Sequence, residues 1–237
     1  MRYLLFFLFF SSHIFAQQNE GFKIDSLPTQ GIVLDKGWKW QEGDNPDFAK
    51  ADFDDSHWEN IDPTKDIHEL PLVFNSKIKW LRLNFEIKNK HNNPLGISIN
   101  QAGASELYLN GRLIHQIGHI DSDSNKIIAS DPIEIPLPIP IDSVGEYTLA
   151  IRYCLQPNIH YTKLYAMNRN SLFYATINDL TYSQNNNREF RVYFTALEAF
   201  KIGLFLMLFI LHISFYSFQR NNKTHLLLSL AFFAPIF

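Results

Sequence analysis

The chain has 237 residues, with 21 Lys and Arg against 24 Asp and Glu and a formal net charge of −3. This weakly acidic balance excludes the basic surface that a nucleic-acid-binding protein needs, so we expect no nucleic acid among its partners. The single cysteine, Cys154, excludes an internal disulfide, and we expect it to be a small core residue at the end of a strand.

Residues 1–16 have the pattern of a secretory signal peptide. Met1 and Arg2 form a basic start, an apolar run follows, and Ala16 is a small residue at a plausible cleavage site before Gln17. The apolar run is shorter than the about 20 residues that a membrane-spanning helix needs. We therefore expect export and a mature chain that begins near Gln17, with an uncleaved anchor as the alternative.

Residues 17–187 are expected to fold as one all-β domain. They hold 15 Lys and Arg against 22 Asp and Glu, a formal charge of −7. Apolar and polar residues alternate in runs that turn residues separate, at 80–87, 95–100, 104–118, 146–155 and 172–182. Short strands with one apolar face each predict two packed antiparallel sheets.

Three details of these runs carry specific expectations. The run 80–87 places four apolar side chains on the core face (Leu81, Leu83, Phe85 and Ile87) and four others outward (Trp80, Arg82, Asn84 and Glu86). Asn110-Gly111 supplies the two positive-φ residues of a type I′ hairpin turn between two strands within 104–118. The Pro-rich run 131–142 is expected to be an edge strand or an extended crossing segment, because proline cannot donate to a ladder.

The C-terminal part is expected to enter a membrane. After a polar linker at Asn185–Asn187, residues 188–218 form a juxtamembrane segment and a first transmembrane helix, whose part 202–218 has no Asp, Glu, Lys or Arg. The loop 219–225 carries Arg220 and Lys223, and basic residues in a short loop favour the cytoplasmic side. Residues 226–237 begin a second, incomplete crossing, which is typical of the front piece of a longer membrane protein.

The middle of the chain resembles the galactose-binding-like jelly rolls, as in the N-terminal sugar-binding domain of family-two glycoside hydrolases. The resemblance is carried in order by "GWKWQEGDNPDFAKADFDDSHWENID" (37–62), "IKWLRLNFEI" (78–87), "ELYLNGRLIHQIG" (106–118) and "GEYTLAIRY" (145–153). It implies a jelly-roll β-sandwich ectodomain. The fold says nothing firm about the ligand.

The join to the membrane resembles the bacterial seven-transmembrane receptors with diverse intracellular signalling modules. The matching stretch is "FKIGLFLMLFILHISFYSFQRNNKTHLLLSLAFF" (200–233), with Gly203, the aromatic end "HISFYSF" and a polar turn. The resemblance implies an inner-membrane protein of a bacterial cell, with the β domain extracytoplasmic or periplasmic. It also implies an output domain, often a histidine kinase, cyclase or phosphatase, which would lie in a longer parent protein, and a possible homodimer there.

Candidate ligand-binding residues come from two motifs. Asp54, Asp55 and Trp58 lie in the acidic stretch "DFDDSHW", and Tyr108 and His115 lie in the hairpin. The competing interpretation is structural: the Asp side chains cap a turn by accepting backbone N–H groups, Trp58 inserts into the sandwich edge, and the hairpin closes the sheet. The structural interpretation is favoured.

No catalytic or metal site is expected. Asp121, Asp123 and Asn125 have the alternate spacing of a calcium loop, but the sixth and twelfth places are Lys126 and Pro132 instead of Gly and Glu. His115 and His119 are four residues apart in strand-turn context, so they share no helical face for zinc. No cofactor is expected.

Two ionisable residues lie within or beside the crossing helix, Lys201 and His212, and such residues are functional candidates by default. Lys201 lies near the outer end and can extend to the interface.

Two functions remain after these exclusions. The first is the extracytoplasmic part of a membrane signalling receptor that binds a small molecule, a carbohydrate or a partner and has no enzyme activity in this chain. The second is a membrane-tethered carbohydrate-binding module or an N-terminal fragment of a family-two-like glycosidase. A tether needs one crossing, whereas a receptor needs the second helix that residues 226–237 begin, so we favour the receptor.

Overall fold

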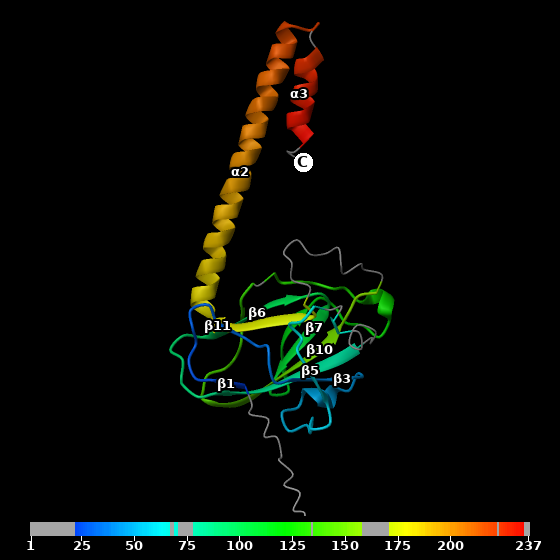
Figure 1. Ribbon diagram of the computed structural model, residues 1–237, viewed down its shortest axis with the longest axis vertical. Coiled ribbons are helices and arrows are strands. Elements are labelled where there is room, and N and C mark those ends of the chain that lie inside the picture. Colours follow the sequence, from blue (N-terminus) through cyan, green and yellow to red (C-terminus); the bar gives the residue numbers. More distant parts are fainter. Residues whose placement is uncertain are drawn as a thin grey trace, which may run out of the picture.

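A computed structural model of the chain describes residues 22–66, 69–70, 78–133, 135–157, 171–221 and 223–234. The expected signal peptide and its cleavage site at Ala16–Gln17 lie outside the described residues. The described part is a β-rich region followed by two helices, of which the longer projects away from the strands (Figure 1).

Two open sheets make up the β-rich region. The larger has the path β4 (Glu59–Ile61), β3 (Trp38–Glu42), β5 (Ile78–Ile87), β10 (Gly145–Cys154), β7 (Ala104–Leu109) and β8 (Arg112–Ile117), with β1 (Phe22–Ile24) beside the end of β5. The smaller has the order β2 (Ile32–Val33), β11 (Phe173–Asp179), β6 (Leu95–Gln101) and β9 (Leu137–Pro138). Two 3₁₀ turns, η1 (Pro46–Ala49) and η3 (Ser124–Lys126), lie in the connections. The pairing is antiparallel as predicted, except that β1 runs parallel to β5.

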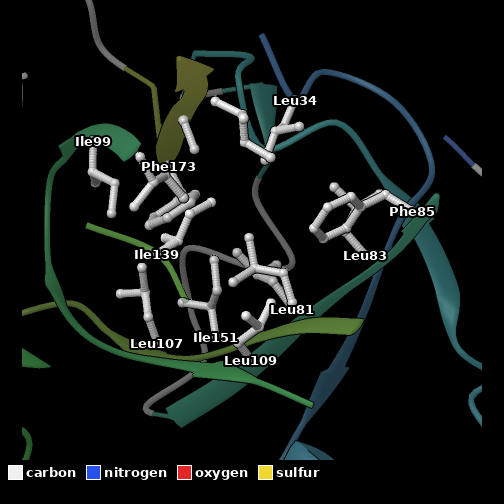
Figure 2. Close-up of a cluster of buried hydrophobic side chains, with 14 of the residues drawn as sticks. Leu34, Leu81, Leu83, Phe85, Ile99, Leu107, Leu109, Ile139, Ile151 and Phe173 are labelled. Atoms are coloured by element: carbon white, nitrogen blue, oxygen red, sulfur yellow. The ribbon is translucent and has the colours of Figure 1, made fainter. Parts of the chain in front are cut away.

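The main core lies between the two sheets. Leu81, Leu83 and Phe85 of β5 face it, as the alternation predicts, and each is at most 3% exposed. Ile99 of β6 and Phe173 of β11 contribute from the smaller sheet, so side chains from both layers meet in one cluster (Figure 2). Cys154 is buried at the end of β10, as expected, and burial raises the pKa of its thiol.

The outer face of the larger sheet is also buried. Trp80 and Arg82 lie on this face, opposite the core, as the alternation predicts, and both are only 1% exposed. The reason is that the segment 43–58, which contains η1, covers this face and forms a second apolar cluster on it with Trp80. Sequence alternation identifies the face of a strand but cannot reveal that a distant segment covers it.

The Asn110-Gly111 hairpin has the predicted geometry. Asn110 has φ 49° and Gly111 has φ 82°, as a type I′ turn requires. The turn joins β7 to β8, and the Asn110 Oδ1 accepts a hydrogen bond from the Thr148 N–H of β10 at 2.8 Å. The Pro-rich run supplies β9 at the edge of the smaller sheet, as expected.

The junction between the β region and the first long helix also differs from the prediction. The helix α2 (Leu180–Phe218) begins directly after β11 and includes the Asn185–Asn187 segment that was expected to be a linker. Its 39 residues are long and apolar enough to cross a membrane, by length and composition. The shorter α3 (Lys223–Phe233) packs antiparallel along the far half of α2 (Figure 1).

We predict that Gly96→Ala disturbs this junction. A Cβ at Gly96 would lie 2.9 Å from the Leu180 side chain and 3.0 Å from Asn178 Oδ1, so the first residue of α2 must shift. We expect the free energy of unfolding to fall by about 1 kcal/mol, the lower end for overpacking, because a leucine end can move. Hydrogen exchange by mass spectrometry should show faster exchange in the first turn of α2. Gly203→Ala is the matched control, since its added Cβ has no atom within 4 Å apart from its chain neighbours and its own helix backbone. Equal effects of the two variants would contradict the prediction.

Candidate functional site

Two of the three aspartates of the acidic stretch, Asp54 and Asp55, have different environments. Asp54 is exposed, and its Oδ1 accepts a hydrogen bond from the Ser56 N–H at 2.9 Å. That backbone bond holds the pKa of the Asp54 carboxyl below its usual range. Asp55 is 7% exposed and faces the outer surface of the larger sheet. The turn chemistry expected for this motif is therefore present at Asp54.

Asp55 forms ion pairs with two cationic side chains of the larger sheet. Its Oδ2 accepts from Arg82 Nε at 2.9 Å, and its Oδ1 accepts from Lys39 Nζ at 2.8 Å. Burial of the carboxyl raises its pKa, but the hydrogen bonds and charges of Lys39 and Arg82 outweigh burial and hold the pKa below the usual range. Arg82 also donates to the backbone carbonyls of Phe48 and Lys50. This ion-pair group attaches the segment 43–58 to the sheet.

Aromatic side chains surround the ion pairs. Trp58 is 5% exposed and makes an edge-on contact with Phe48, with ring centroids 5.0 Å apart. Arg82 lies over the rings of Phe53 and Trp58, at 5.6 and 5.9 Å from the guanidinium carbon. Cation–π contacts of this kind add to the attachment of the segment.

Tyr108 lies at the margin of the same cluster. Its ring lies 5.4 Å from that of Trp80, and its hydroxyl donates to Glu106 at 2.8 Å. Burial, followed by this bond to Glu106, raises the pKa of Tyr108 to about 12. Arg152 connects Glu106 to Asp44, to which it donates two bonds of 2.7 and 2.8 Å. The structure thus brings Asp55, Trp58 and Tyr108 together, and all three side chains make contacts within the protein.

His115 lies apart from this group. Its Nε2 is 2.6 Å from the Pro138 carbonyl oxygen. The contact connects β8, the edge of the larger sheet, to β9, the edge of the smaller one. Ligand binding by Asp54, Asp55, Trp58, Tyr108 and His115 stays a prediction, and the contacts of these residues join parts of the fold.

Lys201 and His212, the two candidate ionisable residues of α2, have different kinds of partner. Lys201 forms an ion pair with Glu198 at 2.7 Å, one turn earlier. His212 Nδ1 lies 3.0 Å from the Nδ1 of His225 in α3, and the two rings stack with centroids 5.3 Å apart. Sequence reasoning selected His212 but not His225, because their contact depends on how α3 folds back.

A buried lysine was also missed. Lys79 of β5 is 0% exposed, and its Nζ lies 5.5 Å from the centroid of the Tyr153 ring. Burial lowers the pKa of Lys79 to about 8. The alternating pattern of β5 places this residue on the core face, in line with Leu81 and Leu83, which is the signal that could have identified it.

Two adjoining cavities lie at the other end of β5, and the second of them is beside the start of α2. Their volumes are about 260 and 330 Å³, and they share His91, Asn92, Asn93 and Leu95 as a common wall. The loop that connects β5 to β6 supplies the three polar residues, and Leu95 is the first residue of β6. Asp179 and Tyr182, at the junction of β11 and α2, line the second cavity. Sequence reasoning read this loop as a turn only, because its polar residues form no recognisable motif.

Asp179 connects this loop to the helix. It is the N-cap of α2: its Oδ1 accepts from the Tyr182 N–H at 2.8 Å, and its Oδ2 accepts from Asn93 Nδ2 at 2.5 Å. The bond from the Tyr182 backbone, followed by the bond from Asn93, holds the pKa of the Asp179 carboxyl below its usual range. The Leu180 N–H donates to the Pro94 carbonyl at 2.9 Å. The cavity wall and the first turn of α2 are therefore bonded to each other.

Comparison with known proteins finds solved structures that resemble the β region, all at low sequence identity. No protein-family model and no curated protein matches the chain. Among solved structures, it is similar to a glycosyl hydrolase family 2 member from Bacteroides cellulosilyticus (17% identity, TM-score 0.39, 61% of this chain and 20% of that chain) and to Bacteroides uniformis beta-glucuronidase (16%, 0.42, 62% and 18%). A third is the beta-glucuronidase from Ruminococcus gnavus (12%, 0.39, 65% and 31%). The chain spans about a fifth of the length of the first two.

We predict that Asp55→Asn destabilises the protein by about 3 kcal/mol, because it leaves the guanidinium of Arg82 buried without its counter-charge. The measurement is urea unfolding at pH 7, followed by tryptophan fluorescence. Asp54→Asn is the matched control, since an exposed side chain that can still accept the Ser56 bond should change stability by less than about 0.5 kcal/mol.

The same pair gives a pH dependence. Because the folded pKa of Asp55 lies below its unfolded value of about 3.9, its contribution is complete above that value and is lost as pH falls through the folded pKa. The unchanged protein should therefore lose stability below about pH 4 more steeply than Asp55→Asn does. Parallel pH profiles for the two proteins would contradict this assignment.

Proposed function

We propose that the chain is the extracytoplasmic, ligand-sensing part of a membrane signalling receptor, and that its β region is a galactose-binding-like jelly roll. The observation that carries the sensing role is the direct passage of β11 into α2, with Asp179 as the shared residue. A rigid connection of this kind can transmit a movement of the β region, whereas a flexible linker would absorb it.

The packing at the junction supports rigid transmission. β11 is an inner strand of the smaller sheet, between β2 and β6, so its position is fixed on both sides. Leu180 fits against Gly96 of β6, where a side chain on residue 96 would collide with it. A displacement of the smaller sheet therefore changes the position of the first turn of α2.

The length of α2 supports a crossing with an outer extension. At 1.5 Å per residue its 39 residues span about 58 Å, roughly twice the about 30 Å hydrocarbon core of a bilayer. The charge-free part, 202–218, is the half beside α3. We place this half in the membrane and the half that follows β11 outside it. Arg220 and Lys223 then lie on the cytoplasmic side, as basic residues of short loops do.

The chain is assigned binding and not catalysis. Asp54 and Asp55, the candidate carboxylates of the acidic stretch, are engaged by a backbone N–H group and by Arg82 and Lys39. A receptor also requires that the ligand bind one arrangement of the protein more tightly than another.

The alternative is a membrane-tethered carbohydrate-binding module or a family-two-like glycosidase fragment. Such a module needs only attachment, and it functions equally well with a loose joint. The two functions therefore differ in what they require of the junction at Asp179.

We predict that the β region lies on the outer side of the cytoplasmic membrane and that the α2–α3 loop lies on its cytoplasmic side. A cysteine at Ser122, which is exposed in the β region, should react with a membrane-impermeant maleimide added to spheroplasts, where the cytoplasmic membrane is the only barrier. A cysteine at Asn221, which is exposed in the loop after α2, should react only after lysis. The native Cys154 is buried, so the unchanged protein supplies the background. The reverse labelling pattern would contradict the receptor proposal.

We further predict that the junction is stiff. Spin labels on cysteines at Ser122 and Arg188, both exposed, should give one narrow distance distribution by pulsed electron paramagnetic resonance in lipid nanodiscs. Asp179→Ala should broaden it, because the variant loses the side chain that caps the helix and the bond to Asn93. Asp52→Ala is the control, because Asp52 is an exposed aspartate of the segment 43–58 that lines neither cavity. A broad distribution in the unchanged protein would favour the tethered module.

A further inference from the structure

The loop between β5 and β6 forms a polar wall around a small apolar floor. Leu95, which lines both cavities, and Ile141, which lines the first, are 2% and 8% exposed. The wall above them carries the amides of Asn89, Asn92 and Asn93. A surface with an apolar base and a polar rim matches a small molecule that has one C–H face and several hydroxyl groups.

The polar groups of the wall are mostly uncharged. An Asn amide has two donors and an acceptor, which suits hydroxyl groups because a hydroxyl both donates and accepts. Asn89 and Asn93 each use one donor within the protein, to the Asp25 carbonyl and to Asp179. Thr29 and Ser143 add hydroxyls at the two sides. The charged groups are Lys90, Asp142 and Asp179, a net negative set that disfavours an anionic ligand.

His91 supplies an unsatisfied group in the shared wall. Its Nε2 is buried and has no hydrogen-bond partner within the described part of the chain. A buried polar atom without a partner costs free energy, and a ligand hydroxyl can remove that cost because the imidazole nitrogen can donate or accept. His91 is one of the residues that line both cavities.

We propose that these adjoining cavities bind a neutral, hydroxyl-rich small molecule, a polyol or a single sugar ring, between His91, Asn92 and the N-cap of α2. Its signalling consequence rests on the receptor function proposed above. Asn93 and Pro94 of the same loop bond to Asp179 and Leu180, so a ligand that orders the loop also fixes the start of α2. The site differs from the residues that the sequence selected, none of which lines it.

Titration calorimetry with the full chain in nanodiscs tests the site. The probes are glucose, galactose, N-acetylglucosamine and myo-inositol, with glucuronate and glucosamine as the anionic and cationic counterparts. We expect saturable binding of at least one neutral probe and about tenfold weaker binding of glucuronate. His91→Leu and Asn92→Ala should each raise the Kd about tenfold, the loss of one hydrogen bond.

Asn60→Ala is the matched control, because Asn60 is an exposed Asn on β4 that lines neither cavity. Asn92 is itself exposed, so its replacement leaves the fold intact even where His91→Leu does not. Binding that neither variant weakens, equal binding of glucuronate, or no binding of any neutral probe would overturn the assignment.

A separate measurement tests the receptor function independently of the binding site. With a bound probe, the distance between labels at Ser122 and Arg188 should shift or narrow relative to the free protein. If a probe binds with the expected loss in Asn92→Ala but leaves that distance unchanged, the binding site stands and the sensing role does not.

Discussion

The arrangement of the whole molecule depends on the two bonds that the Asp179 carboxylate accepts. A strand that ends in a helix must leave the extended conformation at one residue, and the first N–H groups of the helix then need acceptors. Asp179 keeps extended dihedrals, with φ −66° and ψ 116°, while its side chain accepts the Tyr182 N–H. The second oxygen accepts from Asn93, so the direction of α2 is fixed by the β5–β6 loop as well as by β11.

Different interactions define the outer face of the larger sheet and the end of the β region beside α2. The outer face of the larger sheet is closed by the segment 43–58, which the buried Asp55–Arg82 pair holds in place. Buried ion pairs contribute little net stability, but removing one partner is costly, so the pair defines where the segment lies. At the α2 end, by contrast, the loops carry amide and hydroxyl groups that solvent reaches.

The sequence predicted those features that depend on neighbouring residues. The alternation of Leu81, Leu83 and Phe85 determines which face of β5 is buried, and Asn110-Gly111 determines its own turn by local backbone preference. The burial of Arg82 was not predictable, because its partner Asp55 lies 27 residues away and on another element. The contact of His212 with His225 likewise requires the fold of the α2–α3 hairpin.

The prediction of a linker at Asn185–Asn187 was wrong for a different reason. Asparagine has low intrinsic helix propensity, and three in a row favour a loop when the window is read alone. Helix formation is cooperative, however, and the costly step is nucleation. Here the Asp179 cap nucleates the helix on one side and the apolar span continues it on the other, so the three residues only propagate it. Propensity over a short window says little where both ends are fixed by other interactions.

The same reasoning limits how strongly a ligand can act through this junction. A hydrogen bond to a charged group contributes about 1.5–3 kcal/mol, which is a factor of about 10 to 150 in an equilibrium constant. If the Asn93–Asp179 bond forms in one arrangement and is absent in the other, it can change a ratio of about 1:9 to about 9:1, an 80-fold change, but not one of 1:99 to 99:1. A sensor built on this bond alone would therefore be graded, and a sharper response requires that the Leu180–Gly96 contact move with it.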